Sequence, residues 1–388
     1  MSLSYGFTRR EFLRRSAGLV AFLGLGPVSV VTKIAQAQTA FDWQVEVVDE
    51  GASKPVLALD VEGRPHIAYM LEAQRGFLKH AVKQGSEWNI STITVDYLYG
   101  PPAITVDGVT PHITYHNHTF EDQIHASFDG SRWVNTRISH SGHDGWDNSL
   151  IVDSQGKIHA SSVDPSGFGG AGIEYAVFDG ERWQVERVGT RVMYAFGTSI
   201  ALNPQGEPRI TFFNDQGGAL FYASREAGRW RTQIVDGDLN DRARGTGMFS
   251  SLRFDSRGEP VISYYEHTSR SGGMIKLATR VGDVWEIQEI DRLNNVSLGF
   301  VGARNLTSLV LDEADRPRIS YSDERMLKLA LYDGTAWNIE TAISNPERPL
   351  GQMTSLDYNG EAFHIATFDV ASQSPLNGRI LYIRGVPR

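Results

Sequence analysis

The chain has 388 residues, of which 41% are hydrophobic and 21% charged, and it contains no cysteine. This composition excludes wholesale disorder, collagen and coiled coil. The missing cysteine excludes disulfides, thiolate zinc sites and a cysteine nucleophile. The formal net charge of −9 argues against nucleic acid or an anionic membrane as a general partner.

The first 37 residues have the features of an export signal. Residues Thr8–Arg14 resemble the twin-arginine motif, and a mildly apolar stretch follows over Ala17–Val31. That stretch is shorter than the roughly 20 residues of a membrane span, and Ala35–Ala37 fits a small-x-small cleavage site. We therefore expect a signal peptide over residues 1–37 and export of the folded chain by the twin-arginine pathway. The protein would then be periplasmic or extracellular, without a membrane partner.

Removal of this segment would make the remaining chain more acidic. Residues 1–37 hold five of the 37 basic residues and one of the 46 acidic ones, so residues 38–388 carry 32 basic and 45 acidic side chains, a net charge of −13. A polyanionic ligand would therefore need a local basic patch.

Residues 38–388 contain an internal repeat that is marked by tryptophan. Each of seven tryptophans begins a stretch of alternating polar and apolar residues, which is typical of a half-buried strand. Most are preceded by a run such as Ser149–Asp153, a turn with glycine, a segment such as Pro208–Phe212 and a third short strand. The seven recur at spacings of 45 to 55 residues: Trp43, Trp88, Trp133, Trp183, Trp230, Trp285 and Trp337.

Four-stranded units of this length are typical of β-propeller blades. The first strands of the units begin at Leu57, Ile104, Leu150, Ile200, Leu252, Leu309 and Leu356. The last unit has only three strands before Arg388, and residues 43–49 would supply the fourth. We therefore expect an all-β, seven-bladed β-propeller of four-stranded antiparallel blades, closed by an N-terminal strand that completes the last blade, as a single domain over residues 38–388.

Residues that recur at one position of many units are expected to serve the architecture, whereas unmatched residues are better candidates for function. Six histidines share two such positions and are expected to be structural: His66, His112, His159, His364, His80 and His125. Five histidines lie in or beside loops: His116, His118, His140, His143 and His267. Trp146 is the one tryptophan outside the repeat.

In a propeller, the loop that joins the second strand of a blade to the third lies on the same face as the loop that joins the fourth strand to the first strand of the next blade. We therefore expect His116 and His118 to meet His140, His143 and Trp146 there. On the same face, we predict ligand contacts for further unmatched residues: Tyr99, Arg242, Arg244, Tyr265, His267 and Arg270.

This set of side chains suits β-elimination on a uronic-acid polysaccharide. The reaction needs a cation at the carboxylate, a base for the C5 proton and an acid for the leaving oxygen, and His, Tyr and Arg suit these roles. The Pro-x-Ile-Ser-Tyr strands, the loop histidines, Tyr194 and Arg209 resemble the seven-bladed polysaccharide lyases of the ulvan-lyase type. The resemblance implies these catalytic residues: His116 or His118, His140 or His143, Tyr194 and Arg209.

The expected partner is an anionic polysaccharide or oligosaccharide, bound by a monomer that requires no cofactor. A carbohydrate-binding propeller without activity, a lectin, is an alternative, although a cluster on two or three units favours one unique site. A metal site is another, because His116 and His118 lie on one side of a strand end and could hold Zn²⁺ or Cu²⁺ with His140 or His143.

Two further alternatives concern acidic residues. Asp236–Asp241 resembles the start of a calcium loop, so a structural Ca²⁺ is possible there, although the required Gly and terminal Glu are missing. Glycoside hydrolysis by paired carboxylates is also open, and Glu266, Asp144 and Asp147 are the acids to compare.

Overall fold

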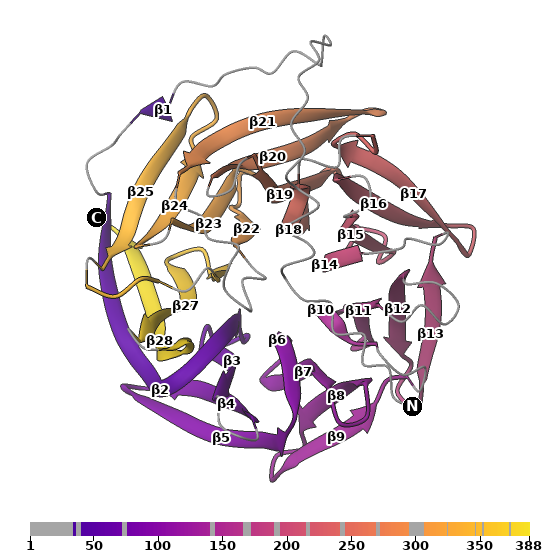
Figure 1. The fold of residues 1–388 in the computed structure, drawn as a ribbon, viewed down its shortest axis with the longest axis vertical. Helices are drawn as coiled ribbons and strands as arrows, with labels where there is room; N and C mark the ends of the chain where they lie inside the picture. Colours follow the sequence, from indigo (N-terminus) through magenta and orange to yellow (C-terminus); the bar gives the residue numbers. More distant parts are fainter. Residues whose placement is uncertain are drawn as a thin grey trace.

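The computed structural model consists of β-sheets arranged radially around a common centre (Figure 1). The structure describes residues 34–35, 40–71, 76–139, 144–165, 172–189, 195–214, 218–240, 245–268, 272–294, 306–323, 325–345, 347–350, 353–371 and 374–388. Within these ranges no helix has the length and apolar character needed to cross a membrane.

Four sheets have four antiparallel strands each, in chain order. These sheets are β6–β9 (Leu98–Asp107, Thr110–Asn117, Asp122–Phe128, Trp133–Arg137), β10–β13 (Trp146–Val152, Ile158–Asp164, Gly172–Phe178, Trp183–Val188), β14–β17 (Ala195–Leu202, Pro208–Asn214, Ala219–Glu226, Arg229–Asp236) and β18–β21 (Gly245–Phe254, Pro260–His267, Gly273–Val281, Val284–Leu293). In Figure 1 the first strand of each sheet lies nearest the centre and the fourth lies at the rim. The fold is therefore an all-β propeller with antiparallel four-stranded blades.

Two further sheets depart from this pattern. One has five strands, because β1 (Ile34–Ala35) pairs in parallel with the rim strand of β22–β25. The strands of that blade are Thr307–Leu311, Pro317–Asp323, Met326–Tyr332 and Trp337–Ser344. The other has seven strands in the order β26-β27-β28-β2-β3-β4-β5. Its strands are Ser355–Tyr358, Phe363–Ala371, Ser374–Pro387, Phe41–Leu59, Pro65–Leu71, Gly76–Gln84 and Glu87–Asp96.

The expectation of seven separate four-stranded blades is therefore wrong, because the described strands form six sheets. The cause is β2, which pairs with β28 over its first part and with β3 over its last part. The chain passes from one unit to the next through β-bulges at Val47/Asp49, Glu50/Ala52 and Ser53/Val56 instead of a loop. Two units consequently share one continuous sheet.

The two ends of the described chain meet in this sheet. Trp43 lies opposite Gly385 and Val45 opposite Ile383, so residues 43–49 pair with the last strand as the sequence indicated. Figure 1 shows β2 and β28 side by side, although they come from opposite ends of the sequence. A Cβ on Gly385 would lie 2.4 Å from the Trp43 ring, so a glycine is required at this contact.

Serine hydroxyls join neighbouring first strands around the centre. In five units, the serine just before the first apolar residue of the first strand accepts a hydrogen bond from the backbone N–H of the next unit. The pairs are Ile200 to Ser149 (3.1 Å), Leu252 to Ser199 (3.0 Å), Leu309 to Ser251 (3.2 Å), Leu356 to Ser308 (3.0 Å) and Leu57 to Ser355 (2.9 Å). The last pair closes the ring between the two ends of the chain, which explains the small polar residue at this repeat position.

The repeated tryptophans pack between neighbouring blades, as the sequence predicted. Five of the seven rings lie on a third-strand side chain of the preceding unit, with centroid distances of 5.2 to 5.5 Å: Trp88 on Tyr382, Trp133 on His80, Trp183 on His125, Trp230 on Tyr175 and Trp285 on Tyr222. Edge-on contacts of this kind add stability beyond the buried area.

The structural role predicted for six histidines is confirmed. They are paired, mostly buried side chains: His66 with His80 (3.0 Å), His112 with His125 (3.1 Å), His159 with Tyr175 (2.7 Å) and His364 with Tyr382 (2.6 Å). Burial lowers the pKa of His80 and of His125 to about 3 and that of His364 to about 4. These rings are therefore uncharged at neutral pH.

Candidate functional site

The end of β7 and the turn into β8 hold the first group of predicted site residues. His116 is the penultimate residue of β7 and is 1% exposed, whereas the His118 side chain is 52% exposed in the turn. Their ring centroids are 5.8 Å apart. The two imidazoles thus form one group, with one buried ring and one ring at the surface.

The turn between β7 and β8 is held by its own side chains. Asn117 Oδ1 accepts the backbone N–H groups of Thr119 (2.9 Å) and Phe120 (3.1 Å), which is an Asx turn. Glu121 follows with a φ of 55°, in the left-handed region that non-glycine residues rarely adopt. This conformation directs the Glu121 carboxylate back toward the histidines.

Glu121 contacts both imidazoles. Its Oε1 lies 3.1 Å from His118 Nδ1, and its Oε2 lies 3.7 Å from His116 Nε2. The three groups each offer one ligand atom, and these atoms all lie within 4.8 Å of one another. Glu121 was not among the residues predicted from the sequence, because a single acid in a polar turn looks like any solvated loop residue. The spacing His-x-His-x-x-Glu is the signal that would have found it.

The backbone of Asp144 sets the orientation of the His116 ring. His116 Nδ1 lies 2.6 Å from the Asp144 carbonyl oxygen, which can only accept a hydrogen bond. Nδ1 therefore carries the proton, and in the neutral ring Nε2 holds the lone pair that faces Glu121. Asp144 is itself fixed, since its Oδ1 accepts the Gln123 N–H at 2.5 Å and its N–H donates to the Glu121 carbonyl at 3.2 Å.

Trp146 joins the group from the neighbouring blade. It is the first residue of β10, and its ring centroid lies 5.0 Å from that of His116. Gly145 makes this approach possible, because it has a φ of 83° and a Cβ on it would lie 2.7 Å from Gln123 Cα. The structure thus brings His116, His118 and Trp146 together, as the loop argument expected.

Arg209 lies elsewhere. It is the second residue of β15, and its guanidinium binds Glu207 at 2.7 Å. Five residues of strand, about 16 Å, separate it from Asn214 at the other end of β15, which is the end equivalent to that of His116 on β7. Its repeat position is that of His66, so Arg209 belongs to the architectural set and is not beside His116.

Tyr265 and His267 lie at the end of β19. Tyr265 is fully buried against Phe249, and burial raises the pKa of its hydroxyl above its usual range. His267 is half-buried with its ring centroid 6.4 Å from that of Tyr265, and burial lowers its pKa. The structure therefore places Tyr265 beneath the surface, where a surface ligand does not reach it.

The remaining predicted site residues give no contact to compare. Tyr99 lies opposite His116 in the β6–β7 register, and nothing is described of its side chain. Residues outside the described ranges are His140, His143, Tyr194, Arg242, Arg244 and Arg270.

The three acids named for hydrolysis serve the fold. Asp144 anchors the loop as described above, and Asp147 Oδ2 accepts the Gly197 N–H at 3.3 Å. Glu266 binds Lys276 at 2.5 Å. In the predicted calcium segment, Asp238 Oδ1 accepts the Asn240 N–H at 2.8 Å, and position 241 is outside the described residues.

One buried carboxyl near this site was not selected from the sequence. Glu174 on β12 occupies the repeat position that holds Lys79, Lys276 and Lys328 in other blades. Burial raises the pKa of Glu174 to about 7, and the charges of Asp144 and Asp164 add to this effect. Glu174 therefore titrates near neutral pH on the blade that contributes Trp146.

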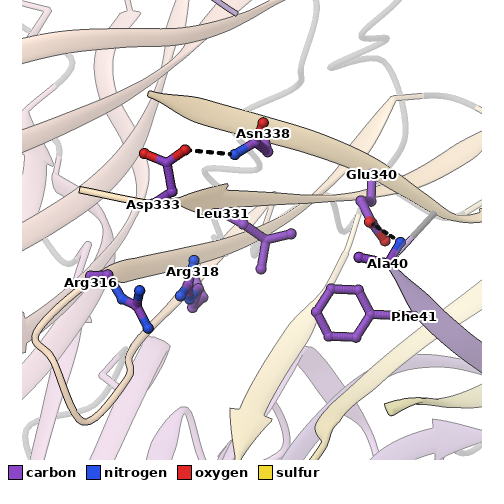
Figure 2. A pocket seen from close by; sticks show the side chains of 8 residues that line it. All are labelled: Ala40, Phe41, Arg316, Arg318, Leu331, Asp333, Asn338 and Glu340. Atoms are coloured by element: carbon purple, nitrogen blue, oxygen red, sulfur yellow. Dashed lines mark hydrogen bonds between the residues drawn. The ribbon is translucent and has the colours of Figure 1, made fainter. Parts of the chain in front are cut away.

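A cavity of about 310 Å³ lies elsewhere, at the seam between β2 and the β22–β25 blade (Figure 2). The Ala40 N–H donates to Glu340 Oε1 at 2.5 Å there, and Arg318 binds Asp312 at 2.6 Å. The lining residues are Ala40, Phe41, Arg316, Arg318, Leu331, Asp333, Asn338 and Glu340. The cavity shares no residue with the His116 group. Its charged groups already have partners, Glu340 across the seam and Arg316, Arg318 and Asp333 within the β22–β25 blade.

No protein-family model matches this sequence, and none of the curated proteins matches it significantly. Solved structures do. An ulvan lyase bound to -[GlcA(1-4)Rha3S]- is similar with a TM-score of 0.60 at 12% identity, over 89% of this chain and 95% of that one. The polysaccharide lyase Uly1 follows with a TM-score of 0.53 at 10% identity, over 86% and 89%. At these identities the likeness shows the fold alone.

A lectin has a similar fold as well. A variant of the Aleuria aurantia lectin in complex with Fucalpha1-6GlcNAc has a TM-score of 0.51 at 13% identity, over 77% of this chain and 99% of that one. Both a class of enzymes and a class of binding proteins therefore share this architecture, and the site must decide between them.

Proposed function

We propose that this protein is a carbohydrate-active propeller, and specifically a polysaccharide lyase that cleaves a uronic-acid-containing polysaccharide by β-elimination. The reaction removes the C5 proton to a base, breaks the C4–O bond and returns a proton to the leaving oxygen, so that a C4=C5 double bond forms. His140 or His143 and Tyr194 would transfer the protons, beside the described group of His116, His118 and Trp146. The Trp146 ring would support a sugar ring.

The observation that carries this proposal is that the His116 group occurs once among the described blades. The equivalent second-strand positions hold other residues: Met70, Val163, Phe213, Tyr265, Ser322 and Phe368. A binding propeller with repeated sites would place similar residues in several blades, whereas one reaction needs one site. The fold shared with an ulvan lyase bound to -[GlcA(1-4)Rha3S]- is consistent with such a reaction, although the lectin has a similar fold.

The test is incubation of the purified protein with a panel of uronic-acid polysaccharides, with ultraviolet absorbance of the unsaturated product as the readout. We expect product from at least one polysaccharide and a large loss of rate in His118→Ala. The control is Glu181→Gln, an exposed turn residue at the opposite end of a blade. Binding to the panel without product would contradict the lyase and favour the lectin.

We also propose that residues 1–37 are a twin-arginine signal and that the exported protein works as a monomer. Arg9→Lys together with Arg10→Lys should leave the chain in the cytoplasm with its first residues intact. N-terminal sequencing of the exported protein should begin at Gln38. Export of the double variant at the normal rate would contradict the twin-arginine route.

A further inference from the structure

We propose that His116 Nε2, His118 Nδ1 and the Glu121 carboxylate form a three-ligand site for a zinc-class divalent metal ion. Tetrahedral Zn²⁺ with bonds of about 2.0–2.1 Å requires ligand atoms about 3.3–3.4 Å apart. Glu121 Oε1 lies 3.1 Å from His118 Nδ1 and Glu121 Oε2 lies 3.7 Å from His116 Nε2, so each carboxylate oxygen is close to that separation from one imidazole. One ligand atom from each of the three residues lies within 4.8 Å of the others. Small side-chain rotations would therefore place all three atoms around one ion.

His116 has the second hydrogen bond that is typical of metal-binding histidines. Such a histidine usually donates its other ring N–H to a carbonyl or carboxylate, which fixes the tautomer and the ring orientation. His116 Nδ1 donates to the Asp144 carbonyl at 2.6 Å, so that Nε2 presents its lone pair toward the other ligands. The bonds of Asp144 to Gln123 and Glu121 hold that carbonyl in place.

The other two ligands are also set by local structure. His118 donates its backbone N–H to the Tyr97 carbonyl at 2.8 Å, which ties the strand end to the neighbouring segment. The Asx turn at Asn117 and the left-handed φ of Glu121 then place the carboxylate against both rings. The arrangement is thus present before an ion binds, which reduces the ordering cost of binding.

The donor set indicates which ions fit. Two imidazole nitrogens and one carboxylate suit Zn²⁺, whereas Ca²⁺ and Mg²⁺ prefer oxygen ligands alone. Three protein ligands leave the fourth position open, as in catalytic zinc sites. Because the His118 side chain is half exposed, that open position faces solvent and a carbohydrate carboxylate could reach it.

The role of the ion rests on the proposed function. β-Elimination needs a cation at the uronate carboxylate, and Arg209 lies at the opposite end of its blade. In the two blades that contribute His116 and Trp146, the described arginines at this end are Arg137 and Arg187, and each binds a buried aspartate, Asp122 or Asp164. A Zn²⁺ ion held by these three residues would accept the uronate carboxylate at its open coordination position and neutralise it as a Lewis acid. The proton transfers would remain with His140 or His143 and Tyr194.

The experiment measures zinc binding directly. The purified protein is stripped with a chelator and titrated with Zn²⁺ against a chromogenic competitor, with Ca²⁺ and Mg²⁺ titrated in parallel. We expect one Zn²⁺ per chain and a higher Tm with Zn²⁺. His118→Ala and Glu121→Gln should each weaken binding by at least about 100-fold, since loss of a supporting residue alone costs 10–100-fold. Glu181→Gln should bind Zn²⁺ as the unchanged protein does.

The outcomes separate this inference from the proposed function. Both variants keep the buried His116, so circular dichroism should show folded protein in each. No zinc binding, or equal binding in Glu121→Gln and Glu181→Gln, would overturn the metal site. Zinc binding with no product from any uronate polysaccharide would overturn the lyase and leave the site standing. Product formation that survives both chelation and Glu121→Gln would overturn the role of the ion in the reaction.

Discussion

The ends of β7 and β19 are equivalent in the repeat: His116 on β7 and His118 in the turn after it correspond to Tyr265 and His267 on β19. The residue between each pair differs: Asn117 caps a turn, whereas Glu266 accepts from Lys276 at 2.5 Å and from Thr246 Oγ1 at 3.2 Å.

This comparison shows how a repeat acquires a unique site. In β19 the polar groups are used within the blade, and Tyr265 fills the core beneath the surface. In β7 the neutral Asn117 orders the turn and Glu121 returns to the two histidines. The equivalent of Lys276 on β8 is Ile124, which has no charge to draw Glu121 away. A few side chains therefore make the end of β7 different from the equivalent end of β19.

The largest effect is expected at the buried ion network beside β19. Lys276 Nζ lies 2.5 Å from Glu266 and 3.0 Å from Asp236, and all three side chains are largely buried. Lys276→Met should lower the free energy of unfolding by about 3–5 kcal/mol, because it leaves two acids without their cation. Ile124→Met, at the equivalent position of β8, should cost less than about 1.5 kcal/mol. If urea denaturation shows equal losses of unfolding free energy in the two variants, the lysine does not distinguish the β19 end from the β7 end.

We expect the stability of the protein to depend on pH through Glu174, whose pKa is raised by burial and by the nearby charge of Asp144. Glu174 has a pKa of about 7 in the folded protein against an ordinary value of 4.5, so the folded state binds the proton more tightly. The contribution of Glu174 to stability is therefore fully present below about pH 4.5 and is lost as the pH rises to 7, by up to about 3 kcal/mol. Glu174→Gln should flatten this slope in urea denaturation. An unchanged slope in that variant would assign the effect to another group.

The next largest effect is expected at Gly145, which allows Asp144 and Trp146 to lie close to the end of β7. Gly145→Ala should lower the free energy of unfolding by about 1–3 kcal/mol and weaken zinc binding on the order of 10–100-fold, because the Cβ would collide with Gln123. Gly108→Ala is a matched control, with a φ of 59° and no atom within 4 Å of its Cβ. It should be strained without any change in zinc affinity; a change there would indicate an indirect effect.

The smallest change in stability is expected from removal of the Tyr265 hydroxyl oxygen. Among the described residues the buried Tyr265 hydroxyl has no hydrogen-bond partner. Tyr265→Phe should therefore change the free energy of unfolding by less than about 1 kcal/mol, whereas His116→Phe should cost about 1–3 kcal/mol because it leaves the Asp144 carbonyl without its donor. Thermal and urea unfolding compare the two. A large loss in Tyr265→Phe would mean that its hydroxyl has a partner beyond the described residues.

Much of the architecture was predictable from local pattern. Alternating residues after each tryptophan predicted the rim strands, and the shared histidine positions separated structural rings from His116 and His118. Arg209 shared its position with those rings, and its packing role follows the same rule. The joined seven-stranded sheet was not predictable, because a bulged strand and a loop have similar sequences over residues 50–56.

The sequence by itself determined the strands, their order and the packing tryptophans, because alternation and repeat spacing are local properties of the chain. It also singled out His116, His118 and Trp146 as residues outside the repeat. Only the tertiary structure decided that Glu121 completes their group, that the Asp144 carbonyl orients His116 and that Arg209 lies at the other end of its blade. Those facts depend on the dihedral angles of one turn and on the approach of segments from different blades, and neither leaves a pattern along the sequence.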